Sequence, residues 1–241
     1  MHKVAKGPET SEAFHDPVMD VAFSVLDREA RAVEYVARNL RTCAASHLGF
    51  RQAVALALQH TNSAPGQAGG KLIVVGVGKS GIIARKIASM LQSLGTQAVF
   101  LHPTESLHGD LGILCPGSDV VLALSFSGNS SEMTTFMALP AVQRCARIAM
   151  SGNRESALVH LADAWLDCSV PHVGASEQPG GSEAWHHIPA PTASTTAMLA
   201  LGDAFVTAVT NAKGVDKATF VNNHPGGSLG IMFTMEMDRG G

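Results

Sequence analysis

Short apolar runs alternate with helix-like patterns through the middle of the chain. The runs at 71–76, 97–101, 119–125, 146–150 and 164–168 are rich in aliphatic residues, as is typical of strands buried on both faces of a parallel sheet. Between them, apolar residues recur at helical spacing over 80–94 and 130–144. This alternation requires right-handed crossovers. We therefore expect an α/β fold with one five-stranded parallel sheet and helices on both faces.

Helical patterns also flank the sheet region. Val21, Val25, Ala32 and Val36 recur at three- and four-residue steps in a helix expected from about residue 18, and 50–60 is a second candidate helix. The segment 192–213 is apolar nearly all round, which is typical of a helix in a core or at a subunit interface. The Gly- and Pro-rich segments 62–70 and 169–191 predict loops. We expect one domain over 18–230, with a flexible arm at 1–17 and a tail at 231–241.

The composition excludes several classes of protein. Charged residues make up 15% of the chain against about 25% in an average soluble domain, which suggests that much surface is hidden against other subunits. The net charge of −3 leaves no basic excess for nonspecific binding of nucleic acid or anionic lipid. The N-terminus lacks a signal-like apolar core, and no run long enough for a membrane span is expected. The four scattered cysteines indicate buried thiols in a reducing compartment, and we expect a cytoplasmic protein.

A glycine-rich turn, GVGKSG (76–81), follows the first strand and opens a helix. It matches GxGxxG, but a dinucleotide site needs an acid at the end of the next strand, which ends at Leu101-His102. A P-loop would need glycine at Ile73. The helix N-terminus, with Gly78, Lys79 and Ser80, favours a site for another phosphate, and a simple tight turn is the alternative.

A second polar turn, SFSGNSS (125–131), closes the third strand. Its hydroxyls and the free N–H groups of the following helix can bind an anion together, although a single serine N-cap is commonplace. The two turns lie after strands of one sheet, and open α/β sheets bind ligands outside the carboxyl ends of their strands. We therefore expect a phosphate pocket between them.

Acids and histidines follow several elements of the expected sheet. Glu132 lies one step into the helix after the serine turn, and 102–110 holds two His and two acids beside the same sheet edge. The segments 182–187 and 223–230 add three more His. Each is weak in isolation. HxxxH and HExxH spacings are missing from the sequence, so we expect no required metal.

Together, the motifs resemble the sugar isomerase (SIS) domain, and more narrowly the arabinose-5-phosphate isomerases of bacterial lipopolysaccharide synthesis. The resemblance rests on five segments in order, VVGVGKSG, HPTESLHGDLG, ALSFSGNSSE, APTASTTAMLALGDA and HPGGSLG. It implies a flavodoxin-like fold and interconversion of D-ribulose 5-phosphate and D-arabinose 5-phosphate, which feeds Kdo formation. It also implies a homotetramer and no organic cofactor. Typical members continue into paired CBS-type regulatory modules, and this chain stops at Gly241, so we expect the short form.

The resemblance also assigns residues. It places the family's functional residues on Lys79, His108, Glu132, Glu183 and His224, and its phosphate-binding serines on Ser80, Ser125, Ser127 and Ser130. Glu183 is aligned across a segment that differs from the family's usual ACPLGLAPT.

An enediol mechanism needs a base, and Glu183 or Glu132 is assigned to that role. Lys79 would offset charge on the enediolate, and His108 and His224 would move hydroxyl protons. Because His224 lies after the long apolar helix, we expect it to reach a neighbouring subunit's site.

The sequence leaves open two other functions and one possible form of inhibition. SIS domains also sense sugar phosphates without turning them over, so a non-catalytic sugar-phosphate-binding regulator is one alternative. An isomerase of another phosphosugar is the second. A zinc ion at His108 and His224 could also inhibit the enzyme by blocking the site, without being required for the reaction.

Overall fold

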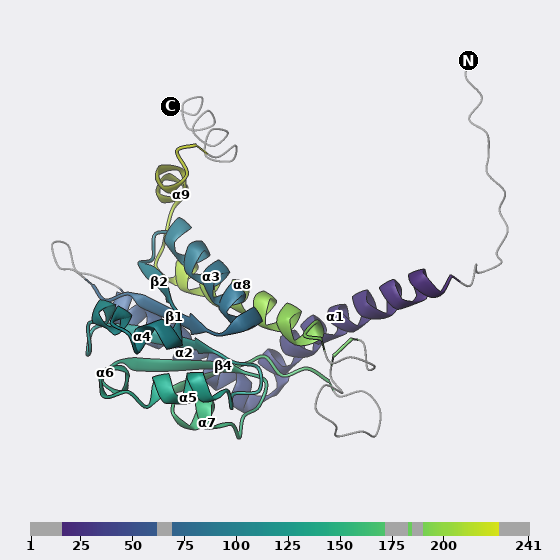
Figure 1. Cartoon of the computed structure of the whole chain (residues 1–241). Coiled ribbons are helices and arrows are strands. Elements are labelled where there is room, and N and C mark those ends of the chain that lie inside the picture. Colours follow the sequence, from purple (N-terminus) through teal and green to yellow (C-terminus); the bar gives the residue numbers. More distant parts are fainter. Residues whose placement is uncertain (1–15, 62–68, 172–182, 185–189, 227–241) are drawn as a thin grey trace, which may run out of the picture.

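A five-stranded parallel sheet in the order β2-β1-β3-β4-β5 lies between two layers of helices (Figure 1). The computed structural model describes residues 16–61, 69–171, 183–184 and 190–226. The predicted fold class is confirmed, and the strand order is that of flavodoxin-like sheets. The strands are β1 (Leu72–Gly76), β2 (Ala98–Leu101), β3 (Val120–Leu124), β4 (Ala146–Ser151) and β5 (Ala164–Asp167).

Long helices cover one face of the sheet. This layer contains α1 (Pro17–Thr42), α2 (Ala44–Thr61), α3 (Gly78–Ser93) and α8 (Ala193–Ala212). Alternate residues of the central strands, such as Leu72, Val74 and Leu122, pack against fully buried residues of these helices, among them Ile87 and Phe205. This is the larger of the two cores, and it positions the N-termini of α3 and α8.

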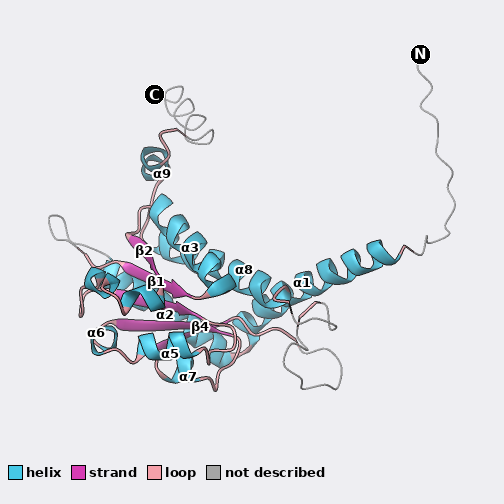
Figure 2. Ribbon diagram, viewed as in Figure 1, coloured by secondary structure: helices cyan, strands magenta, loops and turns pink. Residues whose placement is uncertain are grey.

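Short helices cover the opposite face (Figure 2). They are α4 (Pro103–Ser106), the 3-10 helix η1 (Asp110–Ile113), α5 (Ser131–Met137), α6 (Pro140–Gln143) and α7 (Ala157–His160). The strand side chains that point to this face, including Val75 and Ala123, form a second hydrophobic core with Phe136 of α5. The single helix predicted over 130–144 was wrong in extent. Pro140 has no N–H to continue the ladder, so α5 ends and α6 begins anew at that proline.

Helix α1 extends well beyond the body of the molecule (Figure 1). Asp16 caps its N-terminus by accepting hydrogen bonds from the backbone N–H groups of Val18 and Met19. The buried residues of α1, Ala32 and Val36, lie in its C-terminal half, whereas Phe23 is 60% exposed. The exposed apolar residues of the N-terminal half are Val18, Met19, Val21, Phe23 and Leu26.

Helix α8 is the apolar helix that the sequence predicted over 192–213. Among the described helices it alone is long and apolar enough to cross a membrane, and 50% of that stretch is buried inside the molecule. Its Asp203 forms an ion pair with Lys86 of α3. The ammonium group of Lys213 donates to oxygens of Thr61 and Thr96, and burial lowers the pKa of this lysine. These contacts are those of a core helix, as expected.

One further helix, α9 (Lys217–Asn223), follows α8 and was not predicted. Asp216 caps it by accepting from the N–H of Thr219 at 2.9 Å and from the Thr219 hydroxyl at 2.8 Å. Asn223 then donates to the carbonyls of Gln92 and Ser93 at the C-terminal end of α3. This contact fixes where the chain lies after α8.

The prediction that all four cysteines are buried was wrong for two of them. Cys43 and Cys115 are exposed, and Cys145 and Cys168 are buried. Cys43 lies at the corner between α1 and α2, and Cys115 lies in the turn before β3, where the backbone approaches the surface. Burial raises the pKa of the Cys168 thiol well above its usual value, so this thiol is unreactive.

Helix α2 packs directly on the edge strand β5 through a glycine. A Cβ atom at Gly49 would lie 2.2 Å from the carbonyl oxygen of Trp165, which is backbone and cannot move aside alone. We expect Gly49→Ala to destabilise the fold by about 2 kcal/mol or more, because overpacking of this size forces backbone shifts. Urea unfolding followed by circular dichroism measures this. Gly112→Ala is the control, because a Cβ there meets nothing within 4 Å. Equal stability of the two variants would contradict the packing described.

Candidate active site

The two predicted phosphate turns lie side by side at the carboxyl ends of β1 and β3. These strands are direct neighbours, and Gly76 is paired with Leu124, so the turns leave the sheet at the same level. Helix α3 follows β1 on the face covered by the long helices, and α5 follows β3 on the other. This is the switch point of the sheet, where a crevice opens between diverging connections.

The first turn depends on three glycines. Gly78 has a φ of 57°, a left-handed conformation that favours glycine. A Cβ at Gly76 would lie 2.8 Å from the backbone of Ser80, and one at Gly81 would lie 2.8 Å from the carbonyl oxygen of Gly76. The tight turn brings Lys79 and Ser80 into the first turn of α3, where N–H groups are free for an anion.

The second turn is built from serine hydroxyls. Ser125 Oγ accepts a hydrogen bond from the N–H of Gly128 at 3.2 Å and lies 3.2 Å from Ser130 Oγ. Ser127 Oγ accepts from the N–H of Asn129 at 3.4 Å. Gly128 has a φ of 68° and lies so close to Ser156 that a Cβ would clash. The turn is therefore held by its own hydrogen bonds and by close packing against Ser156.

Glu183 lies at a third helix N-terminus, that of α8. It is 7% exposed, and its Oε2 accepts from the N–H of Thr192 at 2.8 Å, the Thr192 hydroxyl at 3.2 Å and the N–H of Ser194 at 3.3 Å. A carboxylate is favoured at a helix N-terminus, because it satisfies free N–H groups and meets the positive end of the dipole. Oε1 has no hydrogen bond among the described residues.

These three helix starts enclose one cleft of about 330 Å³. Lys79, both phosphate turns and Glu183 therefore meet at a single cavity. The lining residues are Val77, Lys79, Ser80, Ser125, Phe126, Ser127, Ser130, Glu183, Pro191, Ser194, Thr195 and Met198.

Two other predicted site residues lie outside this lining. Glu132 is in the first turn of α5 as predicted, but it is exposed and accepts from the hydroxyl of its neighbour Ser131 at 3.1 Å. His108 is exposed in the turn between α4 and η1, beyond the carboxyl end of β2. Since β2 pairs with β1 in parallel, His108 lies at the same edge of the sheet as the first phosphate turn, although it does not line the cleft.

His224 lies far from the cleft within this subunit. It ends α9, its Nδ1 is 2.8 Å from the carbonyl of Phe220, and its ring stacks on Phe220 at 4.0 Å. Helix α9 contacts the C-terminal end of α3 through Asn223, whereas Lys79 is at the N-terminal end. A helix of 16 residues is about 24 Å long, so one subunit does not bring His224 to Lys79.

The start of α8 was missed as a wall of the cleft. Ser194, Thr195 and Met198 line the cavity together with Pro191. The hydroxyl-rich start of the apolar helix was the available signal, since Ser and Thr are common at helix starts. That this helix start lies beside the two phosphate turns depends on tertiary packing, which the local sequence pattern does not predict.

The cleft suits an anionic ligand that carries a reactive group. Serine hydroxyls, helix N–H groups and the Lys79 ammonium can hold a phosphate, and the Glu183 carboxylate lines the same cleft. Across the described part of the chain, no group of three or more His, Cys, Asp or Glu side chains is placed to hold a metal ion. The suggested zinc pair, His108 and His224, is not brought together within one subunit.

Comparison with known proteins points to one family. A family model described as "SIS domain" matches residues 67–208. The arabinose 5-phosphate isomerase KdsD of Pseudomonas aeruginosa is 43% identical over 171 residues, which is 70% of this chain and 48% of that protein. The KdsD of Escherichia coli K12 is 42% identical over 161 residues, 67% of this chain and 46% of that protein. The chain thus spans about half the length of the curated relatives it matches.

A solved structure is similar over nearly its whole length. The protein c3406 of E. coli CFT073, in complex with A5P, superposes with a TM-score of 0.71 at 30% identity and covers 87% of this chain and 98% of that one. A Bacteroides fragilis protein described as a phosphosugar isomerase involved in capsule formation superposes with a TM-score of 0.69 at 29% identity and covers 87% of this chain and 98% of that one.

The phosphate cradle predicts stabilisation by inorganic phosphate. At a phosphate concentration ten times its Kd, we expect about 1.4 kcal/mol of added stability, seen as a rise in Tm by differential scanning fluorimetry. Ser80→Ala should reduce this rise, because Ser80 lines the cleft. Ser89→Ala, on an exposed position of the same helix, should not. An equal phosphate response in the two variants would place the anion elsewhere.

Proposed function

Because the chain belongs to the SIS domain family, we propose that it is an aldose–ketose isomerase that interconverts D-ribulose 5-phosphate and D-arabinose 5-phosphate and so supplies Kdo for lipopolysaccharide. The observation that carries the proposal is the single cleft that joins the two phosphate turns to the buried Glu183. The names of relatives 42–44% identical to the chain support the choice of substrate.

Binding of the phosphate positions the sugar. The hydroxyls of Ser80, Ser125 and Ser130 and the first N–H groups of α3 and α5 hold the end of the sugar that does not react. This remote binding energy aligns the carbons at the other end of the chain with the acid–base groups. Both turns are ordered by their own hydrogen bonds and glycines, so little reorganisation is needed when substrate binds.

Glu183 is our first choice for proton transfer. In the aldose-to-ketose direction, the base removes the proton from carbon 2, the electrons form the C1=C2 enediol, and the proton returns at carbon 1. The three hydrogen bonds on Oε2 fix the carboxylate and leave Oε1 for the substrate. Glu132 is exposed and outside the cleft lining, which makes it the second choice.

The cationic and imidazole groups complete the mechanism. Lys79, which lines the cleft, would balance negative charge on the enediolate oxygens. His108 and His224 would carry protons between the sugar hydroxyls, including the one released when the cyclic aldose opens.

We also propose that the active unit is a homotetramer with sites shared between subunits. The apolar residues on the projecting half of α1 need a partner, and apolar side chains are also exposed beside the cleft, with Ile82 at 68% and Leu107 at 51%. A neighbour docked there could supply His224, which its own subunit holds far from the cleft. The exposed Cys43 and Cys115 fit a reducing cytoplasm.

An isomerase assay with Glu variants tests the proposed base. Purified protein incubated with ribulose 5-phosphate in deuterated water should exchange a carbon-bound hydrogen, visible by NMR. Glu183→Gln should lower kcat/KM by ~100-fold or more, because the amide cannot take the proton. Glu132→Gln is the matched control and should stay within about fivefold. The reverse pattern would make Glu132 the base, and no exchange by the wild type would leave a sugar-phosphate-binding regulator or an isomerase of another phosphosugar.

Mixing inactive variants tests the shared site. Lys79→Met and His224→Asn should each be nearly inactive alone. If His224 acts in a neighbour's cleft, mixed assemblies contain some clefts with both native residues, and activity should return to a measurable share of wild type. Native mass spectrometry, with one variant carrying a tag that changes its mass, confirms that subunits have exchanged. A mixture that has exchanged subunits and stays inactive would show that both residues must come from one chain.

A further inference from the structure

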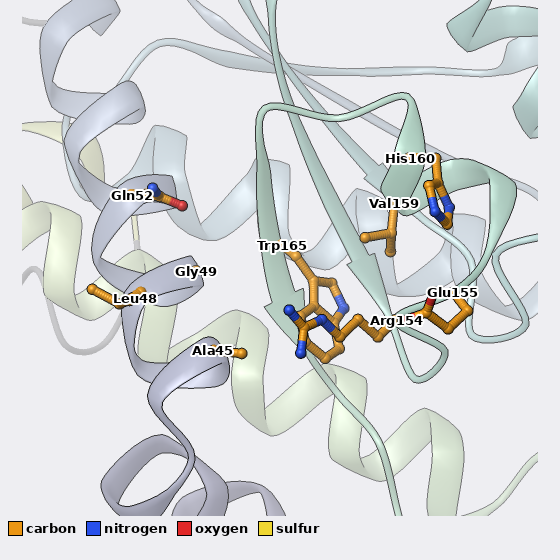
Figure 3. Close-up of a pocket in the computed structure, with 9 residues that line it drawn as sticks. All are labelled: Ala45, Leu48, Gly49, Gln52, Arg154, Glu155, Val159, His160 and Trp165. Carbon is orange, nitrogen blue, oxygen red and sulfur yellow. The ribbon is translucent and has the colours of Figure 1, made fainter.

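A second cleft, of about 510 Å³, lies at the outer edge of β5 (Figure 3). One wall is the beginning of α2 and the other is the segment from the end of β4 through α7, with Trp165 of β5 between them. Two strands, β3 and β4, separate β5 from β1, so this cleft is distinct from the phosphosugar cleft. Its lining residues are Ala45, Leu48, Gly49, Gln52, Arg154, Glu155, Val159, His160 and Trp165.

The guanidinium of Arg154 lies over the indole of Trp165, farther from the ring than in the other two arginine–aromatic pairs of the described residues. Arg154 lies 6.0 Å from the ring centroid, whereas Arg85 stacks on Phe100 at 4.0 Å and Arg38 on Tyr35 at 4.9 Å. A flat ring inserted between two flat groups needs about 7 Å, twice the ~3.5 Å contact distance of carbon atoms. The exposed Arg154 therefore has to move by only about 1 Å to admit one.

The indole itself is held in place. Trp165 Nε1 donates to the carbonyl oxygen of Ser151 at 2.9 Å, and Gly49 packs against the Trp165 backbone. One wall of the cleft is thus a fixed aromatic surface, on which a flat base can stack without ordering the protein.

The polar groups around this surface suit a neutral ligand that has hydrogen-bonding edges. Among the described residues, the side chains of Gln52 and Glu155 have no hydrogen-bond partner, and His160 uses only Nδ1, toward the carbonyl of Ser156. The charges of Arg154 and Glu155 offset each other, which disfavours a polyanion. An amide can pair with the edge of a base, and a carboxylate can accept from ribose hydroxyls.

We propose that this cleft binds a nucleoside, its base stacked between Trp165 and Arg154, its edge paired with Gln52 and its ribose hydroxyls donating to Glu155. A cleft of this volume is within the usual range for small-molecule sites. A nucleoside with ordinary ligand efficiency would bind with a Kd of about 0.1 mM. The site is independent of the phosphosugar cleft, and the proposal stands whether or not the chain is an isomerase.

Tryptophan fluorescence and titration calorimetry test the proposal on the full chain. Adenosine, guanosine, cytidine and uridine are titrated one at a time, with ribose as the control that lacks a base. We expect at least one nucleoside to quench fluorescence and ribose to leave it unchanged. The chain has two tryptophans, so quenching should persist in Trp185→Phe and disappear in Trp165→Phe.

Surface variants locate the binding without disturbing the fold. Arg154→Gln and Gln52→Ala should each weaken binding about fivefold to thirtyfold. The controls are Arg144→Gln and Gln59→Ala, both at exposed positions away from the cleft, and they should bind as wild type. Saturating arabinose 5-phosphate should not compete.

Three outcomes would overturn the proposal. The first is no binding of any nucleoside at 5 mM, roughly fifty times the expected Kd. The second is competition by the phosphosugar together with normal binding by Arg154→Gln, which would place the nucleoside in the other cleft. The third is loss of subunit association, rather than of nucleoside binding, in Arg154→Gln, which would make this surface a contact between copies of the chain.

Discussion

The site depends on the reversal of direction between two neighbouring parallel strands. After β1 the chain crosses to β2 on one side, and from there it returns to β3 on the other side of β1. The helices that follow β1 and β3 must therefore lie on opposite faces, and their first turns separate at one edge of the sheet. The two phosphate turns take their positions in the cleft from this divergence, one through its serines and the other through its glycines.

The third wall of the cleft is also a helix N-terminus, that of α8, but its free N–H groups bind a carboxylate of the protein itself. The N-terminus of α8 has free N–H groups that a buried helix must satisfy, and Glu183 satisfies them with one carboxylate oxygen. The stability of the helix end and the orientation of the carboxylate are thus one interaction. Glu183→Gln keeps a side-chain oxygen that can accept from these N–H groups, whereas Glu183→Ala would leave the helix end without that acceptor.

Most of the fold could be predicted from the sequence because its signals are local. The strands β1 and β3 carry uninterrupted apolar runs, and the turns that follow them carry glycines and serines whose roles follow from backbone sterics. The break between α5 and α6 at Pro140 was equally local but was overlooked. Helix α9 is stabilised by the capping Asp216 and by contacts with α3, and its seven residues are too few to give a clear helical pattern in the sequence.

The remainder depends on tertiary or quaternary packing. The contribution of Ser194 and Thr195 to the cleft arises from how α8 crosses the sheet, and the cleft beside Trp165 arises from how α2 returns to the edge strand. The location of His224 cannot be read from its motif, because its distance from Lys79 is set by the length of α3.

The packing of α2 against β5 has a consequence for solubility. The outermost strand of a sheet offers unpaired backbone groups to any other extended chain, and such edges promote aggregation unless something blocks them. Here the backbone of α2 at Gly49 lies against the Trp165 carbonyl, so a strand added at that point would have to displace the helix. At Gly49 the border of the sheet is covered by main chain rather than by charge, in a protein that has few charged residues.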